Sequence, residues 1–167
     1  NQLGFMVVGV GVGTELALNG TAAHAFSHIL YKALLFMSVG AVLFRTGTSR
    51  ASELGGLYRT MPLTATFCLI GAASISAFPL FSGFVSKSLI MSGAGKEHYQ
   101  FIWLILVFAS AGVLSHSGIK VPYFTFFHHD SGKRPNEAPA HMLLAMGLTA
   151  ILCIYIGIFP NNLYAIM

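Results

Sequence analysis

Charged residues are scarce in this 167-residue chain, and their scarcity decides its class. Lys, Arg, Asp and Glu together make up 8% of the residues, whereas soluble domains carry about 25%. Hydrophobic residues reach 55%, and the mean hydropathy is +0.73. The composition excludes a soluble globular domain and predicts an integral membrane protein.

Residues that hold metals and cofactors are also few or poorly spaced. Cys68 and Cys153 stand singly in apolar segments, which is typical of small core residues rather than of a disulfide or metal site. The adjacent His128 and His129 lack acidic partners at ligand spacing. GxGxxG, Walker and GxSxG patterns are absent. We therefore expect no metal, no cofactor and no redox centre, and we ascribe the net charge of +4 to loop residues rather than to a nucleic-acid partner.

Five apolar segments have lengths suited to membrane-spanning helices. The predicted spans are 3–18, 21–44, 62–92, 101–117 and 141–159. Asn19 and Gly20 are expected to separate the first two, and Pro160 to stop the last. The sequence thus predicts an all-α, polytopic membrane helix bundle that forms a single transmembrane domain over 1–167. The chain begins in an apolar stretch without the flanks of a signal peptide, so we expect it to be a piece of a longer protein.

The third span is predicted to be discontinuous. A continuous helix over 62–92 would be roughly 45 Å long, whereas the hydrocarbon core is about 30 Å thick. Pro79 removes a backbone donor, and Gly83 permits backbone angles that other residues avoid. Unwound backbone at membrane depth is tolerated only where it is buried in protein or lines a water-filled cavity. The sequence therefore predicts a break at Pro79–Gly83, with Lys87 one turn beyond it.

The distribution of Lys and Arg predicts an orientation. Six of the nine lie in the predicted polar loops 45–60 and 120–139, whereas the loop after the first span has none and the loop 93–100 has only Lys96. The positive-inside rule then places the two basic loops in the cytoplasm and the C-terminus outside. Aromatic residues of the second basic loop suit an interfacial belt, namely Tyr123, Phe124, Phe126 and Phe127.

Three titratable residues recur every fourth position inside the second span. His24, His28 and Lys32 lie on nearly the same helix face, about 6 Å apart along the axis. A charged Lys at the centre of a span costs about 2.5 to 3.5 kcal/mol, and Lys32 lies too deep to reach the headgroups easily. Imidazole can pass a proton between its ring nitrogens. We interpret the row as a proton relay, the alternative being polar groups that only hydrogen-bond neighbouring helices.

Lys87 is a second base at membrane depth, beside the predicted break. Broken helices in transporters direct their termini at ions near the midplane. The alternative is a shallower Lys87 that pairs with a loop acid such as Glu97. Glu15 and His116 lie toward the ends of their predicted spans and are weaker candidates, for which contact with the headgroups is the simpler interpretation.

The chain resembles the antiporter-like membrane subunits shared by respiratory complex I and the cation/proton antiporters of Mrp type. The residues that carry the resemblance are the HAFxHxxxKALLFMxxG helix, the GGL loop and the FPxFxGFxSK broken helix. The last third, including FFHHDSGKRPNEAPAHMLLAMGLTAILCIYIGIFPNNLY, looks most like the D-type subunit of the antiporters. The resemblance covers essentially the whole chain.

The resemblance implies a C-terminal fragment with the last five of about fourteen spans, including most of the second of two inverted repeats. It implies that Lys32, His28 and His24 form a central relay and that Lys87 is the terminal residue from which protons exit. The family's Glu/Lys pair of the first half would precede Asn1. Other membrane subunits of the same complex are the implied partners, together with the lipid bilayer, protons and, in an antiporter, sodium.

We therefore expect a proton-translocating subunit of an Mrp-like antiporter or of an NADH:quinone oxidoreductase-type complex, located in a bacterial inner membrane. One alternative is a non-conducting structural subunit whose buried polar groups lock helix packing. Another is a small-solute transporter, which the shortage of substrate-recognition polar residues in the spans disfavours.

Replacing Lys32 with Met separates the relay from the structural alternative. A relay predicts normal assembly of the complex but lost proton flux, because Met fills similar space without a titratable group. A purely structural role predicts lost assembly or little effect. Protein level in the membrane and proton flux into vesicles measure the two properties independently.

Overall fold

The computed structural model describes residues 1–161, and within this part every regular element is helical. The α-helices are α1 (Gln2–Val12), α2 (Glu15–Thr46), α3 (Pro62–Ile75), α4 (Ser82–Lys96), α5 (Gln100–Val113) and α6 (Ala140–Ile158). Two short 3₁₀ turns follow α2, η1 (Ala51–Glu53) and η2 (Leu57–Arg59), and two π-helical segments follow α5, η3 (Leu114–Lys120) and η4 (Tyr123–Phe127). The predicted all-α membrane helix bundle is confirmed.

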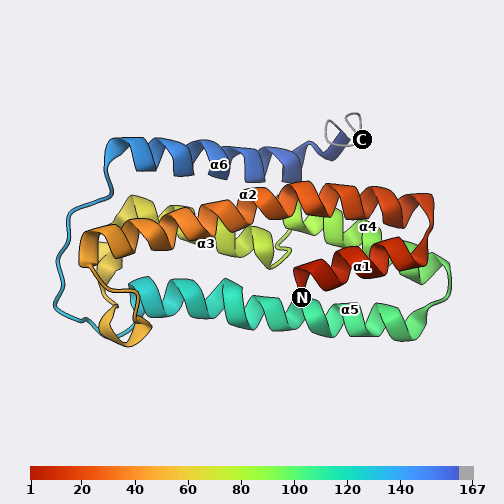
Figure 1. Cartoon of the computed structure of the whole chain (residues 1–167), viewed down its shortest axis with the longest axis horizontal. Coiled ribbons are helices and arrows are strands. Elements are labelled where there is room, and N and C mark those ends of the chain that lie inside the picture. Colours follow the sequence, from red (N-terminus) through yellow and green to blue (C-terminus); the bar gives the residue numbers. More distant parts are fainter. Residues whose placement is uncertain (162–167) are drawn as a thin grey trace.

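Helix α2 is the central element of the bundle. It packs against α1, α3, α4 and α6, which lie around it with their axes roughly along its own (Figure 1). Tyr31 and Leu34 of α2 form a buried core with Cys68 of α3 and with Met146 and Cys153 of α6. In the described part, three helices are long and apolar enough to cross a membrane: 15–46, 100–127 and 140–158.

The first predicted break lies in the wrong place. Gly13, with a left-handed φ of 72°, ends α1, and Thr14 starts α2 by accepting a hydrogen bond from the Ala17 amide. Asn19 and Gly20 lie inside α2. A Cβ on Gly20 would come 2.8 Å from the Leu89 Cβ, so this glycine serves the close approach of α2 and α4 rather than a turn. Helix α1 consequently ends at Val12, before the predicted end of the first span at residue 18.

The third predicted span is broken, which confirms the expectation. Helix α3 has 14 residues and α4 has 15, so neither crosses a hydrocarbon core alone, but the two follow each other along the bundle (Figure 1). Pro79 lies in the connection between them, where Ala77 (φ 59°) and Leu80 (φ 72°) hold left-handed backbone angles. The second half of the broken helix continues to Lys96, beyond the predicted end at Ser92.

Gly83 has a different role from the predicted one. It lies in the first turn of α4, outside the unwound connection, and its φ is not left-handed. A Cβ at this position would clash with the carbonyl oxygen of Ser74. Gly83 therefore allows the start of α4 to pack directly on the end of α3.

The fourth predicted span ends too early. The helix that begins as α5 continues through η3 and η4 to Phe127, so Lys120 and the four aromatic residues predicted in a loop are helical. Pro122 interrupts the regular hydrogen bonding but not the helical course, because the turns around it are π-helical. The connecting loop is therefore 128–139, and His116 lies well inside the helix rather than at its end.

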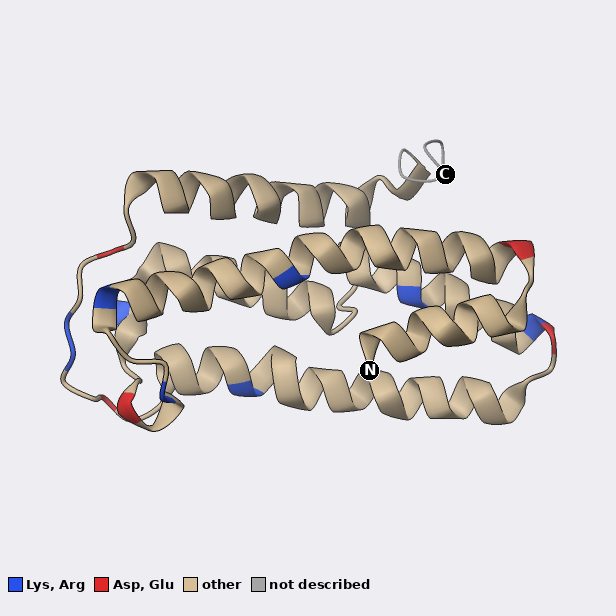
Figure 2. Ribbon diagram, in the orientation of Figure 1, with Lys and Arg blue, Asp and Glu red and all other residues tan. Residues whose placement is uncertain are grey.

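The two basic loops lie together at one end of the bundle (Figure 2). The sequence predicts this, because loops two and four of an alternating membrane topology lie on the same side. A Cβ on Gly55 would clash with the carbonyl oxygen of His129, and the Tyr58 and Phe127 rings stack with centroids 5.5 Å apart. In the second loop, the Arg134 guanidinium hydrogen-bonds the Asp130 carboxylate and holds its pKa well below the usual range. The two loops are therefore packed against each other.

Gly83→Ala is expected to destabilise the protein by about 1–3 kcal/mol, because the added methyl must displace the Ser74 carbonyl in a packed interior. Gly40→Ala in α2 is the matched control, since its Cβ would meet nothing within 4 Å and alanine favours a helix. Thermal unfolding of the purified complexes measures the difference. Equal melting temperatures for the two variants would contradict the packing role.

Candidate functional site

Lys87 lies in the second turn of α4, and its side chain is only 1% exposed. Its Nζ donates a hydrogen bond to the carbonyl oxygen of Ile75, at 2.8 Å. Ile75 is the last residue of α3, where carbonyls lack the amide partners that a continuing helix would supply. The ammonium at the start of the second half-helix thus satisfies a carbonyl that the break has freed.

This contact overturns the alternative in which Lys87 pairs with Glu97. Glu97 is exposed at the end of α4, whereas Lys87 is buried near its start. Among the described residues the ion pairs are Arg50–Glu53 and Arg134–Asp130, neither of which involves Lys87. The Lys87 Nζ also lies over the ring of Phe5, 5.3 Å from its centroid. Lys87 is therefore a buried base without a carboxylate partner in the described part of the chain.

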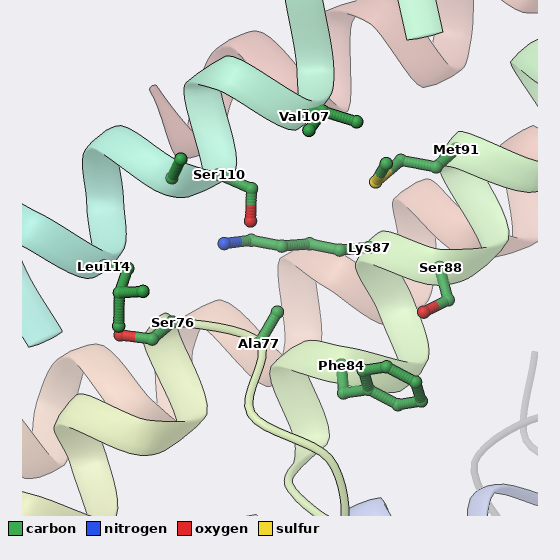
Figure 3. Close-up of a pocket in the computed structure, with 10 residues that line it drawn as sticks. Ser76, Ala77, Phe84, Lys87, Ser88, Met91, Val107, Ser110 and Leu114 are labelled. Carbon is green, nitrogen blue, oxygen red and sulfur yellow. The ribbon is translucent and has the colours of Figure 1, made fainter. Parts of the chain in front are cut away.

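A cavity of about 360 Å³ opens beside Lys87. It lies between α4, the helix break and α5, and Figure 3 shows the amino group of Lys87 directed toward Ser110, with Leu114 and Ser76 nearby. The walls combine three serines, Ser76, Ser88 and Ser110, with apolar side chains. A cavity of this size with several hydroxyl groups can hold water molecules.

His24 connects this site to helix α2. Its side chain is fully buried, and its Nδ1 lies 2.9 Å from the Ser86 Oγ. Its Nε2 lies 2.9 Å from the Oε1 of Gln2, which also accepts a hydrogen bond from the Tyr31 hydroxyl at 3.4 Å. Ser86 directly precedes Lys87 in the sequence. Among the predicted relay residues of α2, His24 is therefore the one that makes a hydrogen bond with the broken helix.

Phe5 packs against both bases. Its ring centroid lies 5.9 Å from that of His24 and 5.3 Å from the Lys87 Nζ. The Phe5 side chain is only 1% exposed, and no hydrogen bond joins His24 directly to Lys87 in the described part of the chain. Ser86 is consequently the polar side chain that joins the His24 position to α4.

The three residues of the row differ in burial. His24 is buried, His28 is half-buried and Lys32 is exposed, because four residues turn a helix by about 400° and each step rotates the side chain by about 40°. The His24 and His28 ring centroids are 6.4 Å apart, and the Tyr31 and His28 rings lie perpendicular to each other, with centroids 5.5 Å apart. The Lys32 Nζ lies over the Phe36 ring at 4.9 Å. The row therefore runs from the core toward the outside of α2.

Lys32 faces a second group of polar residues. It lines a cavity of about 220 Å³ with Ser117 and Val121. Val121 also borders a neighbouring cavity of about 290 Å³ that contains His116 and Lys120. His116 therefore lies near the Lys32 end of the row. Lys120 belongs to the same group, but the sequence did not identify it as a site residue. The nearby Pro122 and the charge of Lys120 itself favoured a loop at this position.

Glu15 remains apart from these groups. It is exposed at the first position of α2, and α2 begins at the same end of the bundle at which α4 ends (Figure 1). In the described part of the chain, three or more His, Cys, Asp or Glu residues never gather as metal ligands would. The expectation of no metal and no cofactor stays a prediction.

Gln2, Tyr31 and Ser86 are partners of His24 that sequence reasoning missed. None of them carries a charge that would mark it in an apolar segment, and no spacing rule connects α1 to α4. Their role becomes visible only once the helices are packed together.

Residues 1–114 match the family model described as NADH:quinone oxidoreductase/Mrp antiporter, transmembrane. The chain belongs to this family. Membership, together with the long apolar helices, makes it an integral membrane protein. A curated relative is NADH-ubiquinone oxidoreductase chain 5 of Hypocrea jecorina, 32% identical over 98% of this chain and 24% of that protein. Another is the A/B-type subunit of a probable K(+)/H(+) antiporter of Rhizobium meliloti (strain 1021), 28% identical over 96% of this chain and 17% of its own length.

Solved structures share the fold of this family member. The Mrp complex from Dietzia sp. DQ12-45-1b contains a chain that superposes with a TM-score of 0.86 at 22% identity, over 98% of this chain and 39% of that one. The archaeal membrane-bound sulfane sulfur reductase also gives a TM-score of 0.86, at 30% identity over 93% of this chain and 26% of the other. The antiporter-like chain spans about a quarter of the length of the first curated relative. The resemblance to the D-type antiporter subunit stays a prediction, since these two curated relatives are a chain 5 protein and an A/B-type protein.

Ser86→Ala is expected to destabilise this subunit by about 1–3 kcal/mol, because it leaves the buried His24 Nδ1 without its partner. Ser92→Ala on the exposed side of the same helix is the control and should change stability by less than about 0.5 kcal/mol. Melting temperatures of the two purified variant complexes report the difference. Identical values would show that the His24–Ser86 contact contributes nothing to stability.

Proposed function

We propose that the chain forms part of a proton-translocating membrane subunit, in which His24, Ser86 and Lys87 link helix α2 to the broken helix. The observation that carries this proposal is the fully buried hydrogen bond between His24 and Ser86, one residue before a buried lysine at a helix break. Buried titratable groups in a membrane helix are costly and mark ion or proton pathways. The chemistry needs only groups that bind and release protons, and these residues supply them.

The proposed route begins at Lys32, passes His28 and His24, and reaches Lys87. The gradient of burial along α2 supports this order, since the exposed Lys32 borders a cavity and the buried His24 contacts α4. Water in the cavity beside Lys87 would carry the proton onward. His116 and Lys120 border the cavity next to that of Lys32, which makes them candidates for groups that supply protons to it.

Lys87 gives the sharpest test of this function. Lys87 can bind a proton as the ammonium that donates to Ile75, and it can release that proton to become an amine. Alanine has no group that binds or releases a proton. Lys87→Ala in the intact complex should abolish proton-coupled transport, while membrane insertion and assembly stay normal. Lys96→Ala is the matched control, because Lys96 ends the same helix but is exposed at the end of the bundle.

Proton flux into sealed vesicles and the amount of assembled complex are the two measurements. Wild-type transport by Lys87→Ala, at equal protein level, would overturn the proposal. Loss of assembly with Lys87→Ala but not with Lys96→Ala would favour the other candidate, a non-conducting subunit whose buried polar groups lock helix packing. The hydrogen bond to Ile75 is the observation that favours this second candidate, since it fixes α3 to α4.

The host is proposed to be a multisubunit membrane complex, either a cation/proton antiporter or a redox-driven oxidoreductase. The relatives support both, as they include an antiporter subunit and NADH oxidoreductase chains. The similar structures come from membrane complexes, which supports other membrane subunits as partners. The proposed drive is sodium exchange in the first case and redox chemistry in a partner subunit in the second.

The proposed location is a bacterial inner membrane, with the basic loops in the cytoplasm and the C-terminus outside. Although Lys120 lies in a helix, the end of the bundle with the basic loops still holds several Lys and Arg residues. The other end holds Lys96. These cations are Arg45, Arg50, Arg59, Lys133 and Arg134. The imbalance supports the same orientation under the positive-inside rule.

A further inference from the structure

Gln2 makes contacts that the proposed proton route does not use. It lies in the first turn of α1, and its Oε1 meets both the Nε2 of His24, at 2.9 Å, and the hydroxyl of Tyr31, at 3.4 Å. The Nε2 of Gln2 is also buried and finds no partner among the described residues.

The partners of His24 are all able to reverse their roles. In neutral imidazole one ring nitrogen donates and the other accepts. With the Gln2 Oε1 facing His24, the Nε2 of the ring carries the proton and donates to Gln2. The Nδ1 then accepts a hydrogen bond from the Ser86 hydroxyl.

The opposite arrangement is satisfied by the same side chains. If the Gln2 amide turns over, its NH₂ group donates to His24 Nε2, and the proton of the ring sits on Nδ1 and is donated to Ser86. The Ser86 hydroxyl then donates to a carbonyl oxygen of Ser82 or Gly83, each 3.4 Å away. Tyr31 can accept from the amide in this state as easily as it donates in the other. Both tautomers of a fully buried imidazole therefore find partners.

A histidine that conducts a proton must change tautomer. It gains a proton on one nitrogen and loses the proton of the other, so only N–H bonds form and break, and the ring is left as the opposite tautomer. Before the next proton arrives, the N–H proton must move back to the first nitrogen, so both tautomers have to be stable at this position. A partner fixed as an acceptor or absent would hold the ring in one form.

We propose that Gln2 is a positioning residue that keeps both tautomers of His24 accessible, through rotation of its amide. The inference rests on the proposed proton route through His24 and deepens it by adding the group that stabilises both tautomers of the ring. A glutamine suits this role because its amide presents both a donor and an acceptor at one position, and its Oε1 already contacts His24 and Tyr31.

Two substitutions in the intact complex are expected to trap His24 in opposite forms. Gln2→Glu, as the carboxylate, supplies only acceptors and should hold a proton on Nε2. Gln2→Met keeps the length of the side chain but removes its polar atoms, and should hold the proton on Nδ1, because a buried N–H without a partner costs more than a vacant acceptor. Both variants should assemble and should lower proton flux by roughly tenfold or more, in line with the size of general acid–base effects.

Isotope-edited infrared spectroscopy of complex containing ring-labelled histidine reports the tautomer, with His24→Phe used to assign the His24 bands. Opposite band shifts in the two Gln2 variants, with reduced flux in both, support the inference, since a merely structural role would not shift the bands in opposite directions. Met6→Leu, a conservative change on the same helix, is the control and should match the wild type.

The outcomes separate this inference from the proposed function. If His24→Phe lowers flux but Gln2→Glu and Gln2→Met conduct at the wild-type rate, the role of Gln2 is overturned and the route stands. If His24→Phe conducts normally, the route itself is overturned and the role of Gln2 with it. Identical tautomer bands in the wild type and both Gln2 variants would also overturn the role of Gln2. Should Gln2→Glu fail to assemble, the flux and bands of Gln2→Met decide alone.

Discussion

The hydrogen bond between the Lys87 ammonium and the Ile75 carbonyl is the interaction that places a titratable group at the helix break, and the site is arranged around it. A buried ammonium and a carbonyl freed from its helix are each costly in an apolar interior. Because the two lie within 2.8 Å, each satisfies the other, and the break can exist at membrane depth. The connection between the half-helices also carries left-handed angles at Ala77 and Leu80, which non-glycine residues adopt only when their surroundings hold them there.

Close packing around α2 brings the other polar residues of the site to the helix break. Gly20 and Gly83 let backbones approach α4 and the end of α3 at distances that any side chain would prevent. The close approach brings His24 to Ser86, and the Phe5 ring packs against both His24 and Lys87. The same packing leaves α4 with a cavity on the side that faces α5. Helix geometry then directs the far end of the row in α2 away from the core, so the titratable groups lead from a buried position to an exposed one.

Sequence patterns predicted the features that depend on single residues or on composition. The break at Pro79 follows from a missing amide donor within a segment too long for the bilayer, and it is where expected. The turn at Gly13 and Thr14 was missed, although a glycine followed by a capping threonine carries the signal. Asn19 and Gly20 form an equally good turn signal but pack inside a helix, since Gly20 meets Leu89 of a segment that no local pattern reveals.

The sequence by itself determined that this is a membrane helix bundle of the antiporter-like family. Hydropathy, the proline that breaks a long apolar segment and the spacing of titratable residues can all be read from the order of the amino acids. Only the tertiary structure decided which of those residues meet. It joined His24 to Ser86 and Gln2, left Lys32 exposed and brought Lys120 into a helix beside His116. The physical reason is that a hydrogen bond between helices depends on their separation and rotation, which are set by packing over the whole bundle.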